Sequence, residues 1–293
     1  MSLEDLLLSW TKRASDTEEA QCEAAERAIK RAIANSAECA SLNITVFAQG
    51  SWMANTNVKK DSDVDVNIRL NSTIYYNIPS GTTASQYGLG PPLITFAEYK
   101  NILERALCSE FGSARRGDKA FFIQENTYRV HADAVPTWLY RSYNSQPNEP
   151  TRTVEGVSLV TDSGTYIINY PLSALQNGIV KNARTGRRYK KAVRIMKRFR
   201  NHFRDKSLPG GNAPSFQIES LLYNLPDGVF SFSTWTETIK QVIKSAYALL
   251  QDQYSVSTLV EVNEVKKLFD GQSSSWKASD AQTYLEQCWK NFP

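Results

Sequence analysis

The sequence is poor in the residues that build zinc sites and disulfide frameworks. Its 293 residues include two histidines and four scattered cysteines, Cys22, Cys39, Cys108 and Cys288, with no Cys-x-x-Cys pair. We therefore expect no zinc ribbon, and we expect the cysteines to be free thiols in a reducing cytosol.

Long apolar runs are also missing. No window approaches the roughly 18 consecutive apolar residues of a membrane span, and Glu4 and Asp5 interrupt the apolar start where a secretory signal would need an uncharged core. Aromatic residues make up 11% and charged residues 22% of the chain, which is typical of a globular enzyme. These features predict a cytoplasmic protein with no membrane partner.

The net charge of +4 is modest, but its distribution is uneven. The stretch from Lys181 to Lys206 carries a run of basic residues against one acid, Asp205; the run comprises Arg184, Arg187, Arg188, Lys190, Lys191, Arg194, Lys197, Arg198, Arg200 and Arg204. Such a run favours contact with a polyanion, either nucleotide phosphates or a nucleic-acid backbone. A solvated helix face is the alternative.

The hydrophobic pattern predicts an α+β fold in two parts. Residues 1–180 are expected to form a core with a mixed sheet and an N-terminal helical spine, and residues 181–293 a mostly helical lobe. Strands are expected at 43–48, 63–70, 120–124 and 128–135, the last ended by Pro136. The Ser-, Thr-, Gly- and Pro-rich stretch 71–92 is expected to be either an ordered excursion or a mobile loop, and the sequence leaves both open.

The most informative residues are three aspartates on two of these strands. In 63–70 apolar residues alternate with polar ones, so Asp63 and Asp65 share one face of one strand. Asp133 lies in the second strand and shares its face with His131, which is expected to be an ordinary strand histidine. Converging carboxylates are the ligands that Mg²⁺ prefers, and their mutual repulsion favours a bound metal.

A Gly-Ser turn precedes the aspartates. Gly50 and Ser51 follow a predicted strand and are expected to present backbone N–H groups and a hydroxyl to phosphates. Joining a hydroxyl to an α-phosphate needs charge neutralisation, which two Mg²⁺ ions about 4 Å apart supply. The spacing of the turn to the aspartates therefore predicts nucleotidyl transfer on a polymerase-β-like core, with Mg²⁺ as cofactor and Mn²⁺ as a possible substitute.

The chain resembles the CD-NTase family, the bacterial relatives of cyclic GMP-AMP synthase and oligoadenylate synthase. The resemblance covers nearly the whole chain and rests on Gly50-Ser51, Asp63-x-Asp65, Asp133, the basic helix with Lys197, and the run Pro214-Ser215-Phe216-Gln217-Ile218-Glu219-Ser220. It implies that the three aspartates are the catalytic metal ligands and that Gly50 and Ser51 bind the triphosphate. It also implies that Lys197 and Ser215 bind the donor phosphates and that Phe216 stacks on the donor base, as aromatic rings do.

The resemblance further implies the reaction. Members of this family join ribonucleoside triphosphates into cyclic di- or trinucleotide signals in anti-phage defence, through 3′–5′ or 2′–5′ bonds, and the product diffuses to an effector. The zinc-binding Cys/His insertion of the animal synthase has no counterpart here, so no duplex DNA activator is expected. The sequence ends in Asn291-Phe292-Pro293, without the terminal glycine that some members conjugate to a target.

Two other functions stay open at this point. The first alternative is an enzyme of the same superfamily that adds nucleotides to an RNA end or another acceptor as a linear product, with the basic helix as a nucleic-acid track. A catalytically inactive nucleotide sensor is the second alternative, although a sensor has no need of all three aspartates. We expect a monomer that uses ribonucleoside triphosphates as both donor and acceptor.

Overall fold

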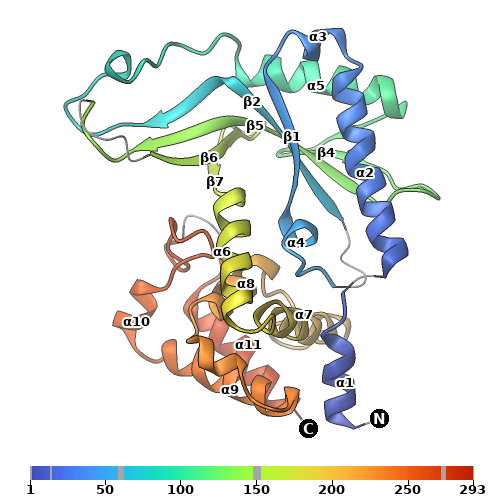
Figure 1. Ribbon diagram of the computed structural model, residues 1–293, viewed down its shortest axis with the longest axis vertical. Helices are drawn as coiled ribbons and strands as arrows, with labels where there is room; N and C mark the ends of the chain where they lie inside the picture. The colour runs from blue at the N-terminus through green and yellow to red at the C-terminus, as the bar shows by residue number, and fades with distance from the viewer. Residues whose placement is uncertain (1, 14, 59–62, 148–152, 272–274, 293) are drawn as a thin grey trace. The chain divides into compact units, whose positions relative to one another are not determined.

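The computed structural model describes residues 2–13, 15–58, 63–147, 153–271 and 275–292 (Figure 1). The chain forms two compact units, which are described separately. The sheet unit comprises Ser15–Trp52 and Ser62–Pro171, and the helical unit comprises Met1–Ala14, Met53–Asp61 and Leu172–Pro293.

The sheet unit is built on one mixed β-sheet of the described residues. Its strands are β1 (Ile44–Gln49), β2 (Val64–Asn77), β3 (Arg115–Arg116), β4 (Phe121–Ile123), β5 (Ala132–Tyr143), β6 (Thr153–Val160) and β7 (Tyr166–Asn169). The order is β1-β2-β5-β4-β3, and β6 pairs with both β5 and β7. Strands β2 and β5 are parallel, whereas the other pairs are antiparallel. The predicted α+β class with a mixed sheet is confirmed.

Helices cover one face of this sheet. They are α2 (Asp16–Ala34), α3 (Ala37–Ala40) and α5 (Phe96–Phe111); the short α4 (Gly50–Met53) follows β1, and a 3-10 turn, η1 (Ala84–Tyr87), precedes α5. Capping boxes at Ser15 and Thr95 start α2 and α5. The apolar side chains of β2, among them Val64, Val66 and Ile68, are fully buried in the core shared with these helices. Residues of opposite parity, including Asp65, therefore lie on the other face.

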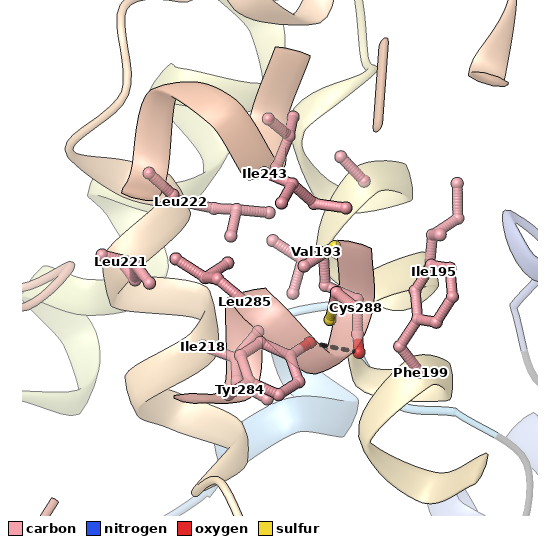
Figure 2. Close-up of a cluster of buried hydrophobic side chains, with 14 of the residues drawn as sticks. Val193, Ile195, Phe199, Ile218, Leu221, Leu222, Ile243, Tyr284, Leu285 and Cys288 are labelled. Atoms are coloured by element: carbon pink, nitrogen blue, oxygen red, sulfur yellow. Dashed lines mark hydrogen bonds between the residues drawn. The ribbon is translucent and has the colours of Figure 1, made fainter. Parts of the chain in front are cut away.

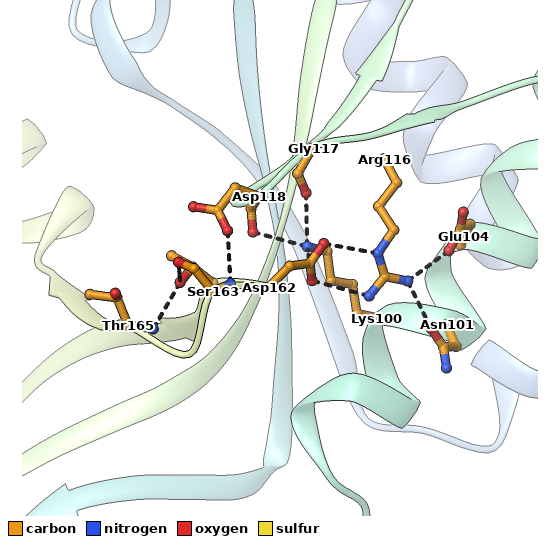
Figure 3. Close-up of polar contacts among 10 residues, drawn as sticks. Lys100, Asn101, Glu104, Arg116, Gly117, Asp118, Asp162, Ser163 and Thr165 are labelled. Atoms are coloured by element: carbon orange, nitrogen blue, oxygen red, sulfur yellow. Dashed lines mark hydrogen bonds and ion pairs between the residues drawn. The ribbon is translucent and has the colours of Figure 1, made fainter.

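A polar network stabilises the loops at one side of the sheet unit (Figure 3). The ammonium of Lys100, on α5, donates to the carbonyl oxygens of Gly117 and Asp118 and to Asp162 Oδ1, at 2.8–3.0 Å. Arg116 pairs with both oxygens of Asp162 and also donates to Glu104 on α5. Because Lys100 is 1% exposed, these bonds compensate the cost of burying its charge.

The helical unit packs around an apolar core from several helices (Figure 2). Its helices are α1 (Leu3–Trp10), α6 (Pro171–Arg184), α7 (Tyr189–Asp205), α8 (Ser215–Tyr223), α9 (Trp235–Leu249), α10 (Gln253–Thr258) and α11 (Ala278–Lys290), with a 3-10 turn, η2 (Asp227–Phe230). Tyr284 of α11 donates its hydroxyl hydrogen to the carbonyl of Met196 on α7, so a buried polar group is satisfied inside this core.

The structure draws the domain boundary differently from the predicted 1–180 and 181–293. Helix α1 belongs to the helical unit, because Leu7 is in its core, Trp10 packs edge-on against Phe199, and Glu4 accepts hydrogen bonds from the first N–H groups of α9. Residues 53–61 belong to it too, and α6 already begins at Pro171. Only α2 of the expected N-terminal spine covers the sheet.

Two strands are longer than predicted. β2 continues to Asn77 through a register shift between Leu70 and Ile74, because Ile74, Tyr75 and Tyr76 suit a strand. β5 passes through Pro136 and ends at Tyr143. On one side β5 pairs with β4 at 132–134 and with β6 at 138–143, so Pro136 falls where that side has no partner strand. A proline without an N–H is tolerated at such a position.

Candidate active site

Two of the three predicted aspartates lie side by side on neighbouring strands. Asp65 of β2 and Asp133 of β5 are register partners in the parallel pair, so their side chains share a face of the sheet. Asp63 lies one residue before the start of β2 and is exposed. The predicted strand thus begins one residue later than expected, at Val64, and its alternation places Asp65, but not Asp63, on a strand face.

The electrostatics of this pair are dominated by burial and by repulsion between carboxylates. Burial raises the pKa of Asp65 to about 7, with smaller contributions from the charges of Asp133 and Asp63. Burial and the charge of Asp63 also raise the pKa of Asp133. Asp133 Oδ1 is buried and accepts no hydrogen bond from any described residue. A buried acceptor with no donor favours a cationic ligand at this position.

Gly50 is packed directly against Asp65. Its φ of +72° suits glycine, and a Cβ added there would overlap Asp65 Oδ2 and stand 3.1 Å from Cγ. Gly50 and Ser51 open α4 immediately after β1, whose last residue, Gln49, is the register partner of Asp65. The Gly-Ser turn and the carboxylates, predicted as one constellation from their spacing, are thus neighbours in the sheet unit.

The residues fit a magnesium ion in its usual mode of binding. Among the described residues, no three His, Cys, Asp or Glu side chains already surround one metal position. Mg²⁺, however, is commonly held by one or two carboxylates together with water and substrate phosphates. Asp65, Asp133 with its buried Oδ1 that accepts no hydrogen bond, and Asp63 just before the strand match that donor set.

Sequence reasoning missed a cation beside the pair. His131 and, to a smaller extent, Arg115 of β3 offset part of the rise in the pKa of Asp133, and the Arg115 guanidinium lies over the ring of Phe122, 4.0 Å from the centroid. His131 approaches Asp133 to 3.9 Å, too far for a hydrogen bond. Only the register of the short strands β3 and β4 brings Arg115 here, and no sequence motif signals it.

The helical unit holds the other predicted site residues. Ser215 begins α8, and Phe216 beside it is 40% exposed, so its ring is available to a ligand. Lys197, on α7, is 2% exposed and is the predicted residue that the structure buries most deeply. Its Nζ lies 3.4 Å from Glu219 Oε2 on α8, and it donates to Thr56 Oγ1 at 3.0 Å.

Lys197 thus belongs to a buried triad. Thr56 donates its hydroxyl hydrogen to Glu219 Oε2 at 2.8 Å, so the three groups bond to one another. Glu219 is the counter-ion of Lys197 in this triad. Removing one member of a buried ion pair is costly. To bind a phosphate, the ammonium of Lys197 must either replace the Glu219 carboxylate with the phosphate or contact both at once. The sequence offered Glu219 as part of a motif but gave no sign of the pairing.

Comparison with known proteins identifies the class. Residues 176–292 match the cGAS/DncV-like nucleotidyltransferase C-terminal helical domain. Relatives aligned over nearly the full chain exceed 30% identity. The chain therefore belongs to the CD-NTase family of nucleotidyltransferases, and the resemblance drawn from its motifs is confirmed.

The individual relatives are bacterial cyclic nucleotide synthases. The cyclic dipyrimidine nucleotide synthase CdnE of Cecembia lonarensis is 35% identical over 98% of this chain and 97% of its own. That of Legionella pneumophila is 36% identical over 98% and 96%. The CdnE c-UMP-AMP synthase of Rhodothermus marinus, solved with Apcpp and Upnpp, has a TM-score of 0.84 at 28% identity, covering 98% of this chain and 96% of that one.

None of the helices in the described part of the chain is long and apolar enough to cross a membrane.

Proposed function

We propose that this protein is a Mg²⁺-dependent cyclic oligonucleotide synthase that joins two or three ribonucleoside triphosphates and closes the product into a ring. One observation carries the proposal: Asp65 and Asp133 are register partners on one face of the sheet, and Gly50 packs against Asp65. That arrangement occurs in a chain that aligns from end to end with cyclic dinucleotide synthases.

Each site residue has a role in this proposal. Asp65, Asp133 and the exposed Asp63 would hold Mg²⁺, which supplies charge neutralisation at the phosphates. Asp65 and Asp133 would hold this cation from paired strands, whose register places both side chains on one face of the sheet. Gly50 and Ser51 bind the triphosphate through backbone N–H groups and the serine hydroxyl.

The helical unit supplies the donor contacts. Ser215 would donate its hydroxyl hydrogen to a phosphate at the first turn of α8, where the N–H groups also favour an anion. The exposed ring of Phe216 stacks on the donor base, a contact worth about 1–3 kcal/mol. Lys197 contributes positive charge from α7, balanced by Glu219 in the absence of nucleotide.

The relatives guide the choice of bases. Two are named for cyclic dipyrimidine products and the third for c-UMP-AMP. We therefore propose that at least one pyrimidine triphosphate is a substrate.

The protein would act as a cytoplasmic monomer without duplex DNA, and its product would diffuse to an effector in anti-phage defence. Size-exclusion chromatography with light scattering tests the monomer.

The rival linear product is not favoured, because the relatives that align over nearly the whole chain make rings. The test is mass spectrometry after incubation with the four ribonucleoside triphosphates and Mg²⁺, followed by phosphatase. We expect phosphatase-resistant cyclic dinucleotide or trinucleotide, lost with EDTA and with Asp65→Asn. Asp16→Asn, at the exposed start of α2, is the matched control and should keep activity. Phosphatase-sensitive linear oligomers, or full activity of Asp65→Asn, would contradict the proposal.

A further inference from the structure

The sheet face that carries the carboxylates also carries a chain of three polar side chains from three neighbouring strands. Thr137 of β5 donates its hydroxyl hydrogen to Asn67 Oδ1 at 2.6 Å. Asn67 of β2 then donates from Nδ2 to Gln49 Oε1, the last residue of β1, at 3.1 Å. Thr137 and Asn67 are both fully buried.

The register places this chain beside the candidate active site. Gln49 is the partner of Asp65 across β1 and β2, and Asn67 follows Asp65 by two residues, so all three share a face. Thr137 likewise has the parity of Asp133 on β5. The chain of bonds therefore ends at the residue that precedes Gly50.

The direction of the bonds fixes the amide of Asn67. The hydroxyl of Thr137 is the donor to Asn67 Oδ1, so Nδ2 is turned toward Gln49 and holds its side-chain oxygen. A buried amide or hydroxyl destabilises a protein unless it is bonded. In the interior of a sheet, an apolar pair of similar volume would pack without that requirement. The polar pair adds orientation, which an apolar pair cannot provide.

That orientation matters because Gly50 has little room to move. The Cα of Gly50 is so close to the Asp65 carboxylate that a single methyl group would overlap it. A change in the conformation of Gln49 shifts the start of the Gly-Ser turn against Asp65, and a misplacement of about 1 Å in a catalytic arrangement can cost about 100-fold in rate.

We propose that Asn67 is a positioning residue, oriented by Thr137, that acts through Gln49 to hold the Gly50-Ser51 turn in place for the triphosphate. The inference rests on the proposed nucleotidyl transfer at Asp63, Asp65 and Asp133. Asn67 itself touches neither nucleotide nor metal in this scheme. It determines where the turn stands relative to the carboxylates.

The test removes one hydroxyl. Thr137→Val keeps the shape of the side chain but leaves the amide of Asn67 without its orienting donor. A misplacement of about 1 Å in the turn costs up to about 100-fold. We expect the Kd for a non-hydrolysable triphosphate, measured by calorimetry, to rise about tenfold or more, and kcat/KM to fall in parallel. Thr137→Ser keeps the donor and should restore both values.

A matched control separates positioning from stability. Thr161, in the loop after β6, is also buried, and its hydroxyl accepts from the N–H of Thr165. Thr161→Val should lower the melting temperature without raising the Kd. If Thr137→Val at a temperature where it is fully folded has the same Kd and kcat/KM as Thr161→Val, the inference is wrong.

The path through Gln49 has its own test. Gln49→Leu breaks the end of the chain at a half-buried position and should fold even if Thr137→Val does not. If Thr137 acts through Gln49, combining the two substitutions adds little to the loss caused by either one, whereas independent effects multiply. Multiplied losses, or an unchanged Kd for Gln49→Leu, would overturn the inference.

These results are distinguishable from a failure of the proposed function. Full activity of Asp65→Asn would remove the nucleotidyl-transfer assignment and this inference with it. An inactive Asp65→Asn beside a Thr137→Val protein with unchanged affinity would leave the assignment in place and reject only the role of Asn67.

Discussion

Replacing Gly50 with alanine tests the close packing of the Gly-Ser turn on the carboxylates. In the structure the Cα of Gly50 faces Asp65 so closely that the new Cβ would overlap Oδ2. An ordinary carbon contact is about 3.5 Å or more, so either the carboxylate or the turn must move by roughly 1 Å.

The magnitude has two parts. A left-handed φ costs an alanine about 1–2 kcal/mol, and the stiffer unfolded chain returns about 0.4–1 kcal/mol of that. The free energy of unfolding should therefore fall by about 1 kcal/mol from the backbone alone. Displacing Asp65 acts on the reaction, where a shift of this size costs about 100-fold in rate.

Gly88→Ala provides a control with the same backbone strain. Gly88 has a φ of +67° in the sheet unit, and nothing lies within 4 Å of the Cβ that it would gain. We expect both variants to lose similar stability in urea, and only Gly50→Ala to lose about 100-fold in the rate of cyclic product formation. If Gly50→Ala forms cyclic product at a rate close to that of Gly88→Ala, the contact between Gly50 and Asp65 does not contribute to the reaction.

Three further predictions concern buried charges. In the folded, metal-free protein the pKa of Asp65 is raised from its ordinary 3.8 to about 7. The free energy of unfolding should therefore fall as the pH rises from about 4 to about 7, because the unfolded chain releases this proton first. In EDTA, the melting temperature of Asp65→Asn should be above that of the parent protein at pH 8 and close to it at pH 4. Lys100→Met removes the buried donor to the carbonyls of Gly117 and Asp118 and to Asp162, although Arg116 still donates to Asp162; it should lower the free energy of unfolding by about 1–3 kcal/mol in urea, with nucleotide affinity unchanged. Glu219→Gln removes the carboxylate that pairs with buried Lys197 and should lower the free energy of unfolding by about 3–5 kcal/mol. Adding Lys197→Met should recover part of that loss, and strictly additive losses would show that the two charges are not coupled.

The parts of the site that the sequence predicts are those fixed by local rules. Alternation along β2 places Asp65 on the face opposite Val64 and Val66, and the structure keeps that parity. The Gly-Ser turn after β1 follows from composition and spacing. Sequence alone did not reveal that β2 and β5 pair in parallel with Asp65 opposite Asp133, because register depends on contacts between segments far apart in the chain.

Elements that depend on tertiary partners were predicted less well. The hydrophobic stripe of α1 is correct, but nothing in it specifies that Leu7 packs in the helical unit. Pro136 reads as the end of a strand, because the sequence does not show that one side of β5 lacks a partner there. Lys197 reads as a phosphate ligand, and its partner Glu219 becomes evident only when α7 and α8 are packed.

The basic run of α7 has a partly structural explanation, which one substitution can test. Arg194 is buried, and its guanidinium donates to the carbonyl of Thr11 at 2.7 Å and to that of Asn55 at 2.5 Å. These acceptors belong to two segments that are far apart in sequence, and a planar guanidinium reaches both whereas a single ammonium does not. If α7 were basic only to attract polyanions, keeping the charge would suffice.

Arg194→Lys keeps the charge but loses the planar guanidinium that reaches both carbonyls. It should therefore lower the free energy of unfolding by about 1–3 kcal/mol, the cost of a buried acceptor left unbonded. Lys191→Arg is the matched swap at an exposed position of the same helix and should change stability by less than about 0.5 kcal/mol. Equal stability of the two variants in chemical denaturation would mean that Arg194 has no structural role and that polyanion contact explains its charge. A loss confined to Arg194→Lys would mean that attraction of phosphates by α7 rests on its exposed residues, such as Lys191, and not on the whole run.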